Sequence, residues 1–288
     1  MSRIKLAISN KGRMSEEILE ILERAGLSIK KEKSRSLSAV TIDGSYEIVF
    51  VRTKDIPKFI NEGTIDIGIT GYDVVQEFGA EVDMLMDLDL GKCTMIVANR
   101  EEDPISSYAD VLEGTKVATS FPNVAKNFFA KQGKNVHVIE VSGATEITPR
   151  LELADVIVDI TSSGSTLKMN KLKIIGEIFE SQAVIIGRKN ISQDRKQEVE
   201  AFIRAIKSAI DAKQKKYLMA HVPKSSLADV RAFLPGMSSP TITTLLDNDD
   251  EVVIHVVVDK NKVYESIDKL KQLGGGSILI LTVDQMVK

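Results

Sequence analysis

Strand-like and helix-like segments alternate along most of this chain, and that alternation restricts its fold more than any other feature. Residues 3–8 place an apolar side chain at every second position and predict a strand, whereas residues 15–25 place Ile18, Ile21, Leu22 and Ala25 on one helical face. Further strands are predicted at 47–52, 65–70, 94–98, 116–119, 136–141, 155–160 and 184–187, with a short helix from Asp55 and a long helix at 193–216. This order favours an α/β fold with largely parallel sheets.

A different order begins near residue 215. Strands are predicted at 217–222, 241–246, 251–258 and 277–283, with helices at 225–234 and 262–273 and an acidic turn at 247–250. The order βαββαβ is typical of a ferredoxin-like module. The sequence therefore predicts a separate C-terminal domain.

Composition excludes several classes of protein. The 38 Lys and Arg residues are balanced by 41 Asp and Glu residues, which argues against a protein that coats nucleic acid. A single cysteine, Cys93, excludes an intramolecular disulfide framework, and three dispersed histidines argue against a zinc site. No stretch approaches about 18 consecutive apolar residues, and the first ten residues do not resemble a secretory signal. We therefore expect a cytoplasmic protein that binds neither nucleic acid nor membrane.

The strongest local motif is the run ADVIVDITSSGSTL at residues 154–167. An apolar strand ends in Asp159, and a loop of small hydroxyl residues then leads toward a helix. Small residues let backbone N–H groups approach an anion, and the hydroxyls add donors. A plain Ser/Thr-rich turn with a helix cap explains the composition about equally well. The motif is neither a Walker loop nor a G-x-G-x-x-G fingerprint.

This segment resembles the phosphoribosyl-pyrophosphate loop of ATP phosphoribosyltransferases. The matching residues are Glu146, Ala154, Ile157, Asp159, Ser163, Gly164, Thr166 and Leu167. The chain departs from the family pattern at Glu152, where glycine is expected, and at Met169 and Lys171, where a small residue and glycine are usual. Three further blocks resemble the family in the same order: residues 11–13, the pair 51–57 and 63–73, and residues 234–241.

The resemblance implies a three-part architecture. The catalytic region is expected to be two-lobed and similar to periplasmic binding proteins, with lobe I at residues 1–95 and 180–215 and lobe II at 96–179. A ferredoxin-like regulatory domain is expected at 216–288. This corresponds to the long form of the enzyme, which needs no separate regulatory subunit and assembles from dimers into hexamers.

The resemblance also implies the first reaction of histidine biosynthesis. Adenine N1 of ATP attacks phosphoribosyl pyrophosphate to give N1-(5-phosphoribosyl)-ATP and pyrophosphate, with Mg²⁺ on the pyrophosphate. Such a reaction depends on positioning and electrostatics. The expected phosphoribosyl-pyrophosphate contacts are Asp155, Asp159, Thr161, Ser162, Ser163, Gly164, Ser165, Thr166 and Leu167. The expected ATP contacts are Lys11, Gly12, Arg13, Arg52, Gly71 and Asp73. Lys11, Arg13 and Asp159 are the candidate catalytic residues, and Asp159 is also the candidate metal ligand.

Each of these residues also has a simpler explanation. Lys11 and Arg13 are solvated charges in most loops, Asp55 and Asp73 can cap helices, and Arg52 can pair with a neighbouring carboxylate. Cys93 is expected to be a small core residue rather than a nucleophile.

For the C-terminal domain, the resemblance implies allosteric inhibition by histidine. Candidate effector contacts are Ser238, Ser239, Thr241 and Gly275, although the glycine run 274–276 can equally be a turn between helix and strand. Two other functions remain open on the sequence. One is a non-catalytic two-lobed small-molecule-binding protein. The other is a different phosphoribosyltransferase class, whose loop usually carries two adjacent acids, whereas here Ile160 follows Asp159.

Overall fold

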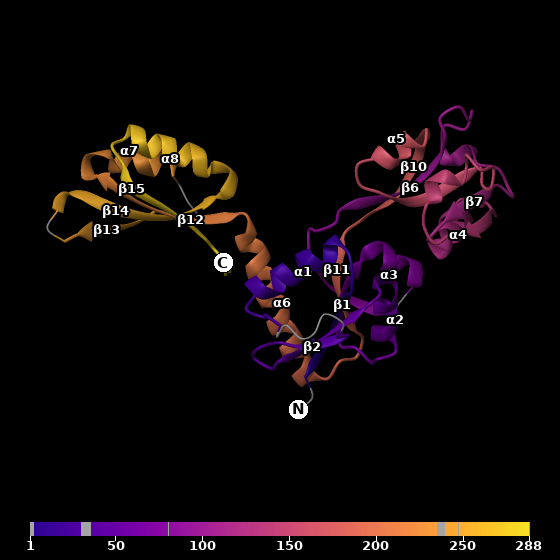
Figure 1. Cartoon of the computed structure of the whole chain (residues 1–288), viewed down its shortest axis with the longest axis horizontal. Coiled ribbons are helices and arrows are strands. Elements are labelled where there is room, and N and C mark those ends of the chain that lie inside the picture. Colours follow the sequence, from indigo (N-terminus) through magenta and orange to yellow (C-terminus); the bar gives the residue numbers. More distant parts are fainter. Residues whose placement is uncertain (1–2, 30–35, 80, 235–239, 247, 288) are drawn as a thin grey trace. The chain divides into compact units, whose positions relative to one another are not determined.

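The computed structural model describes residues 3–29, 36–79, 81–234, 240–246 and 248–287, and three sheets organise these residues (Figure 1). The first sheet has the order β2-β3-β1-β4-β11-β5. Its strands are β1 (Ile4–Ser9), β2 (Ser38–Val40), β3 (Tyr46–Val51), β4 (Ile67–Gly71), β5 (Val82–Asp87) and β11 (Ala183–Arg188). We call this sheet, with the 3₁₀ turn Thr53–Asp55 and helices α2 (Ile56–Asn61) and α3 (Tyr72–Phe78), the first lobe. Ile56, Ile60, Val184 and Ile186 contribute to its apolar core.

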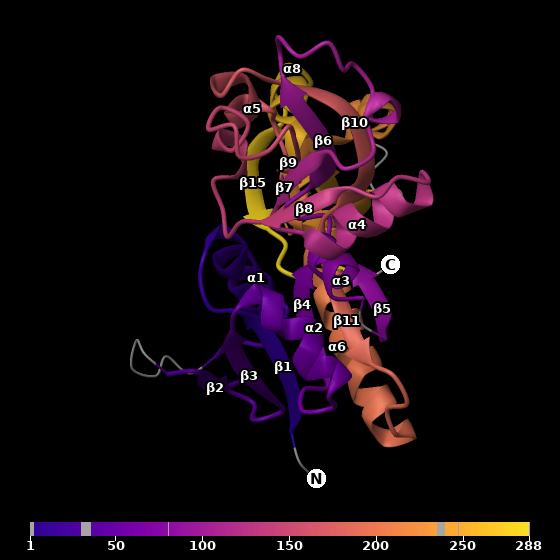
Figure 2. The ribbon, with the colours of Figure 1, turned by 90° about the vertical axis from the view of Figure 1, so that its right-hand side faces the viewer.

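The second lobe is built on a sheet of order β10-β6-β9-β7-β8. Its elements are β6 (Cys93–Arg100), β7 (Lys116–Thr119), α4 (Pro122–Lys131), β8 (His137–Glu140), β9 (Val156–Thr161), α5 (Ser165–Met169) and β10 (Leu172–Ser181). Helix α4 packs beside β7 and β8 (Figure 2), where Phe129 is fully buried with Val117 and Val156.

Both sheets are mixed rather than largely parallel. β1 runs parallel to β3 and β4, and β7 runs parallel to β8 and β9. β6, β10 and β11 run antiparallel to their neighbours. These three strands lie where the chain passes from one sheet to the other, at Cys93 and again between Ser181 and Ala183. β6 and β11 enter their sheets at the edge where the parallel strands end, so they run opposite to those strands, and β10 runs back toward that edge beside β6.

The C-terminal module has the predicted ferredoxin-like topology. Strands β12 (Lys215–Pro223), β13 (Thr241–Leu245), β14 (Asn248–Asp259) and β15 (Gly276–Thr282) pair in the order β13-β14-β12-β15, and all pairs are antiparallel. Helices α7 (Leu227–Phe233) and α8 (Val263–Gln272) lie on one face of this sheet (Figure 1). β14 already begins at Asn248, so the predicted acidic turn is strand from that residue on, and residue 247 lies outside the described part. The two-lobed α/β fold with a C-terminal βαββαβ domain is thus confirmed.

The chain divides into two compact units, residues 1–18 with 29–199 and residues 19–28 with 200–288. The first unit holds both lobes. The boundary between the units falls within helices α1 (Arg13–Arg24) and α6 (Gln193–Lys213). In the second unit, the Arg24 guanidinium donates to the Val283 carbonyl at 2.9 Å, and the Gln285 amide donates to the Arg24 carbonyl at 3.0 Å. The predicted domain boundaries at 95, 180 and 215 stay predictions. Among the described residues, no helix is long and apolar enough to cross a bilayer.

Candidate active site

Three parallel strands of the first lobe end at the same edge of their sheet. Ser9 pairs with Val51 across β1 and β3, and β4 lies on the other side of β1. Ligands of open α/β sheets bind outside such carboxyl ends. The predicted ATP contacts follow these strands: Lys11 and Gly12 after β1, Arg13 at the start of α1, Arg52 after β3, and Gly71 with Asp73 at the end of β4. The fold therefore brings this predicted group to one edge, where the side chains of Lys11 and Arg52 are exposed.

The loops at this edge are tied to one another. The Asn10 N–H donates to the Val51 carbonyl at 2.9 Å, and the Thr53 hydroxyl donates to the Ser9 hydroxyl at 3.0 Å. The Thr70 hydroxyl donates to the Thr53 carbonyl at 3.2 Å. These bonds fix how the loops after β1, β3 and β4 stand relative to each other.

The junction of β4 and α3 requires a glycine. A Cβ atom on Gly71 would lie 2.2 Å from Asp73 Oδ1, a contact that no real side chain makes. Asp73 is buried, its N–H donates to the Ser181 hydroxyl at 2.9 Å, and that hydroxyl donates back to Asp73 Oδ1 at 2.7 Å. One carboxylate oxygen of Asp73 is therefore held by the end of β10 in the second lobe.

The hydroxyl-rich loop follows β9 at the corresponding edge of the second lobe. The Gly164 N–H donates to the Thr161 hydroxyl at 3.1 Å, and Gly164 has a left-handed φ of +69°. The Ser163 and Ser165 hydroxyls lie 2.9 Å apart, and Leu167 anchors the loop in the core. Helix α5 is only five residues long, so the donors available to an anion are chiefly backbone N–H groups and hydroxyls.

Asp159 lies in β9 close to this loop. Burial raises the pKa of the Asp159 carboxyl above its ordinary value, and the negative charge of Glu146 adds to the rise. The Ile160 N–H, which donates at 2.8 Å, and the charge of Lys54 lower the same pKa. A carboxylate held in this way is stabilised by hydroxyl donors or a cation. The described residues contain no cluster of three or more His, Cys, Asp or Glu side chains that could hold a metal ion. A Mg²⁺ ion at Asp159 would therefore take most of its ligands from substrate oxygens or water.

Asp155 is not brought to the loop. It precedes β9 at the opposite end from Thr161, and its carboxylate accepts the Lys116 N–H at 3.1 Å. This contact joins the starts of β7 and β9.

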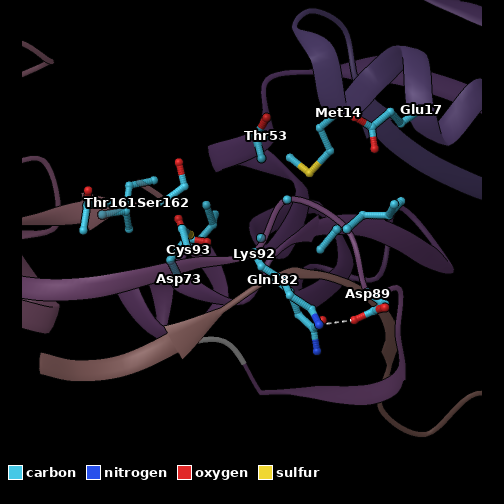
Figure 3. Close-up of a pocket in the computed structure, with 16 residues that line it drawn as sticks. Met14, Glu17, Thr53, Asp73, Asp89, Lys92, Cys93, Thr161, Ser162 and Gln182 are labelled. Carbon is cyan, nitrogen blue, oxygen red and sulfur yellow. Dashed lines mark ion pairs between the residues drawn. The ribbon is translucent and has the colours of Figure 1, made fainter. Parts of the chain in front are cut away.

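A pocket of about 640 Å³ lies within the first compact unit and draws residues from both lobes (Figure 3). Thr161 and Ser162 lie on one side of the close-up, and Met14, Glu17 and Thr53 lie on another. Of the predicted site residues, Gly71, Asp73, Thr161 and Ser162 line this pocket, whereas Lys11, Arg52, Asp159 and residues 163–167 do not.

Other pocket residues were not predicted from the sequence. They lie mainly at the two places where the chain passes between the lobes, and they include Asp89, Leu90, Gly91, Lys92, Cys93, Gln182 and Ala183. Asp89 and Lys92 form an ion pair. The sequence does offer a signal for these residues. Lobe boundaries predicted near 95 and 180 imply that the chain crosses twice between the lobes, and each crossing must pass the cleft.

Cys93 lines the pocket instead of joining a core. Burial raises the pKa of its thiol, and the negative charge of Asp73 adds to the rise, although the Ser181 hydroxyl opposes it. A raised pKa disfavours the thiolate, so the position is unsuited to a nucleophile.

Of the predicted effector residues, only Thr241 and Gly275 are described, and they do not meet within one chain. Ser238 and Ser239 lie outside the described residues. Thr241 begins the edge strand β13, and Gly275 precedes the opposite edge strand β15. Three strand spacings separate these edges by about 14 Å, so one histidine molecule cannot contact both residues in the same chain. Gly275 also has a packing role, because a Cβ there would lie 2.6 Å from the Leu270 carbonyl oxygen.

Comparison with known proteins places the whole chain in one family. The family model described as HisG, ATP phosphoribosyltransferase, matches residues 52–208, and the model described as HisG, C-terminal domain, matches residues 212–285. An ATP phosphoribosyltransferase of Methanocaldococcus jannaschii is 41% identical over 288 residues, covering 99% of this chain and 100% of the relative. One of Gemmatimonas aurantiaca is 40% identical, with 99% of each chain covered.

A solved structure agrees with these matches. A chain of the ATP phosphoribosyl transferase (HisG:HisZ) complex from Thermotoga maritima is 28% identical, with a TM-score of 0.65, and the match covers 72% of this chain and 98% of that one. These matches give no support to the alternative of a non-catalytic binding protein. The chain belongs to the ATP phosphoribosyltransferase family of transferases.

Proposed function

We propose that this chain condenses ATP with phosphoribosyl pyrophosphate in histidine biosynthesis. The observation that carries the proposal is a pocket of about 640 Å³ that the hydroxyl-rich loop lines with Thr161 and Ser162, in a chain that is 41% identical over its length to a named ATP phosphoribosyltransferase. A pocket of this size is within the range of small-molecule sites.

In the proposed reaction, adenine N1 forms a bond to the anomeric carbon and the bond from that carbon to the pyrophosphate oxygen breaks. The loop N–H groups and the hydroxyls of Thr161 to Thr166 hold the ribose 5-phosphate. Asp159 accepts ribose hydroxyls and stabilises positive charge that develops on the sugar. Lys11, Arg13 and Arg52, which follow the parallel strands of the first lobe, neutralise triphosphate or pyrophosphate. Apolar surface from Met14, Val74 and Leu90 is available to the adenine ring.

A Mg²⁺ ion on the pyrophosphate would stabilise the charge of the leaving group. Asp159 and the loop hydroxyls offer only oxygen ligands, which are the ligands that a hard cation such as Mg²⁺ prefers.

We further propose that the chain forms homo-oligomers, from dimer to hexamer, and that histidine inhibits it through the C-terminal module. Since the module is part of the chain, no separate regulatory subunit is required. Thr241 and Gly275 lie too far apart for one molecule within one chain, so a shared histidine site would combine residues of two subunits. We also propose a cytoplasmic location, because the proposed reaction belongs to histidine biosynthesis.

The test is an absorbance assay of the purified chain with ATP, Mg²⁺ and phosphoribosyl pyrophosphate. We expect an adduct that forms only when all three are present. Thr166→Ala removes a hydroxyl donor to a charged phosphate and is expected to weaken phosphoribosyl-pyrophosphate use by about 1.5–3 kcal/mol. Thr115→Ala, in a loop of the second lobe away from the pocket, is the matched control. Absence of product under all oligomer and salt conditions would refute the proposed reaction.

A further inference from the structure

The first turn of helix α4 is capped by a side chain from the other lobe. Helices need acceptors for their first N–H groups, but the N-cap residue of α4, Phe121, makes no side-chain cap bond. Glu77 in α3 supplies them. Its carboxylate accepts the Asn123 N–H at 3.0 Å and the Val124 N–H at 3.0 Å. The Asn123 side-chain amide donates back to the Glu77 carbonyl at 3.0 Å.

A basic residue of the first lobe contacts the same segment. The Lys54 amine donates to the Ser120 carbonyl at 3.3 Å and stands 5.8 Å from the centre of the Phe121 ring. Residues 120–124 are thus held by an acid from α3 and a base from the turn after β3. We call these contacts of Glu77 and Lys54 the interlobe clamp.

The clamped segment stands beside the proposed phosphoribosyl-pyrophosphate loop. Residues 120–124 follow β7, the loop follows β9, and these two strands are parallel neighbours, with Thr119 paired to Val158. The carboxyl ends of both strands therefore lie at one edge of the sheet. The charge of Lys54 also lowers the pKa of Asp159.

Helix α3 meets the second lobe at its other end as well. Asp73 is bonded to Ser181, and the rings of Tyr72 and Phe179 meet edge to face with centroids 5.6 Å apart. One short helix is therefore attached to the second lobe at both ends, at β10 and at α4. Two attachments restrict the relative motion of the lobes far more than one does.

We propose that Glu77, supported by Lys54, is a positioning residue that holds the second lobe at the separation required for its substrate loop to face the first lobe. This inference rests on the proposed function. Loss of the clamp lowers the fraction of molecules in the competent arrangement. The apparent affinity for phosphoribosyl pyrophosphate falls in proportion to the fraction that remains competent. Chemistry in the assembled complex is expected to be unchanged, because Glu77 does not line the pocket.

The alternative is a local helix cap that stabilises α4 and nothing else. The two differ in how far the effect of a mutation extends. A local cap protects only the first amides of α4, whereas the clamp also restrains the crossing segments 89–93 and 181–183, which lie outside α4.

The experiment compares Glu77→Ala with Glu81→Ala, an exposed acid that pairs with Lys189 of the same lobe. Hydrogen–deuterium exchange of the full chain is expected to rise at least about tenfold at residues 123–125 and severalfold at both crossing segments in Glu77→Ala alone. The KM for phosphoribosyl pyrophosphate should rise about five- to twentyfold, with kcat within about twofold of wild type.

Glu77→Gln, which keeps an acceptor oxygen, should restore part of the affinity. Lys54→Met should shift the same quantities in the same direction by a smaller amount.

Faster exchange confined to residues 123–125 with an unchanged KM would reduce Glu77 to a local cap and overturn the proposal, as would unchanged exchange at every segment. If Glu77→Ala does not fold, Glu77→Gln and Lys54→Met decide by the same criteria. If the wild-type chain makes no product, the proposed function fails, while exchange at the crossing segments still decides whether the clamp restrains the lobes.

Discussion

Two residues that flank the hydroxyl-rich loop in the sequence hold left-handed backbone without being glycine. Glu152 has a φ of +58° and Lys171 a φ of +54°. At both positions the ATP phosphoribosyltransferase family pattern has glycine and this chain does not. The backbone geometry that favours glycine is therefore retained here by non-glycine residues, at a cost of roughly 1–2 kcal/mol each.

We accordingly expect Glu152→Gly and Lys171→Gly each to stabilise the fold. Relief of the left-handed strain is partly offset by the greater freedom of glycine in the unfolded chain, which leaves a net gain of about 0.5–1 kcal/mol. Equilibrium urea unfolding would measure it. Lys168→Gly, inside α5, is the control and should destabilise by a similar amount. A loss of stability in both test variants would contradict the strain argument.

Asp159 is the residue whose pH dependence is most informative. Its pKa is raised in the folded protein, so the native state binds a proton more readily than the unfolded state. The charged carboxylate therefore lowers the free energy of unfolding at pH values above the native pKa. This destabilisation disappears as the pH falls below the pKa of Asp in the unfolded chain, about 3.9. Asp159→Asn should raise the melting temperature at pH 7, and the gain should shrink toward pH 4 while product formation falls. Asp155→Asn, at the other end of the same strand, is the comparison variant. A pH-independent gain would exclude the carboxyl as its source.

At the scale of elements, the β4–α3 junction depends on Gly71. Gly71→Ala places a methyl group against Asp73 Oδ1 and forces Asp73 away from Ser181. We expect a loss of about 1–3 kcal/mol in unfolding free energy together with reduced turnover, because the junction lines the pocket. The matched control is Gly276→Ala, where a Cβ meets nothing within 4 Å. If the double variant Gly71→Ala/Asp73→Ala were no more stable than the sum of its single changes, the clash would not be the cause.

Element by element, regular patterns were predicted well and irregular ones were missed. The strands at 116–119 and 184–187 follow from short apolar segments, and the C-terminal βαββαβ order follows from clear alternation. Strand β10 was missed because register shifts between Ile174 and Gly176 and between Glu177 and Phe179 break its two-residue period. Strand β2 has only three residues, and β5 is an edge strand that is largely exposed, so neither carries a strong apolar signal.

At the scale of the whole molecule, the C-terminal module is expected to carry the response to histidine. Deletion of residues 216–288 should abolish inhibition by histidine while product formation persists. The deletion also removes Val283 and Gln285, which are hydrogen-bonded to Arg24. Full-length Arg24→Leu/Gln285→Ala is therefore the control, since it breaks these contacts and keeps the module, and it should remain inhibited. Initial rates across a histidine titration measure the inhibition of the truncated chain and of the full-length control variant. Inhibition that persists in a folded truncation would move the effector site elsewhere.

The α/β class, the C-terminal module and the hydroxyl-rich loop with Asp159 are all predictable from sequence alone. These depend on local periodicity and on residue types within a short span, which a linear pattern records. Only the tertiary structure decided that Asp155 stands at the far end of its strand from the loop, that residues 89–93 line the pocket, and that Glu77 caps a helix 45 residues further along the chain. These contacts join segments distant in sequence, and their positions depend on how the sheets order their strands. No local pattern contains that information.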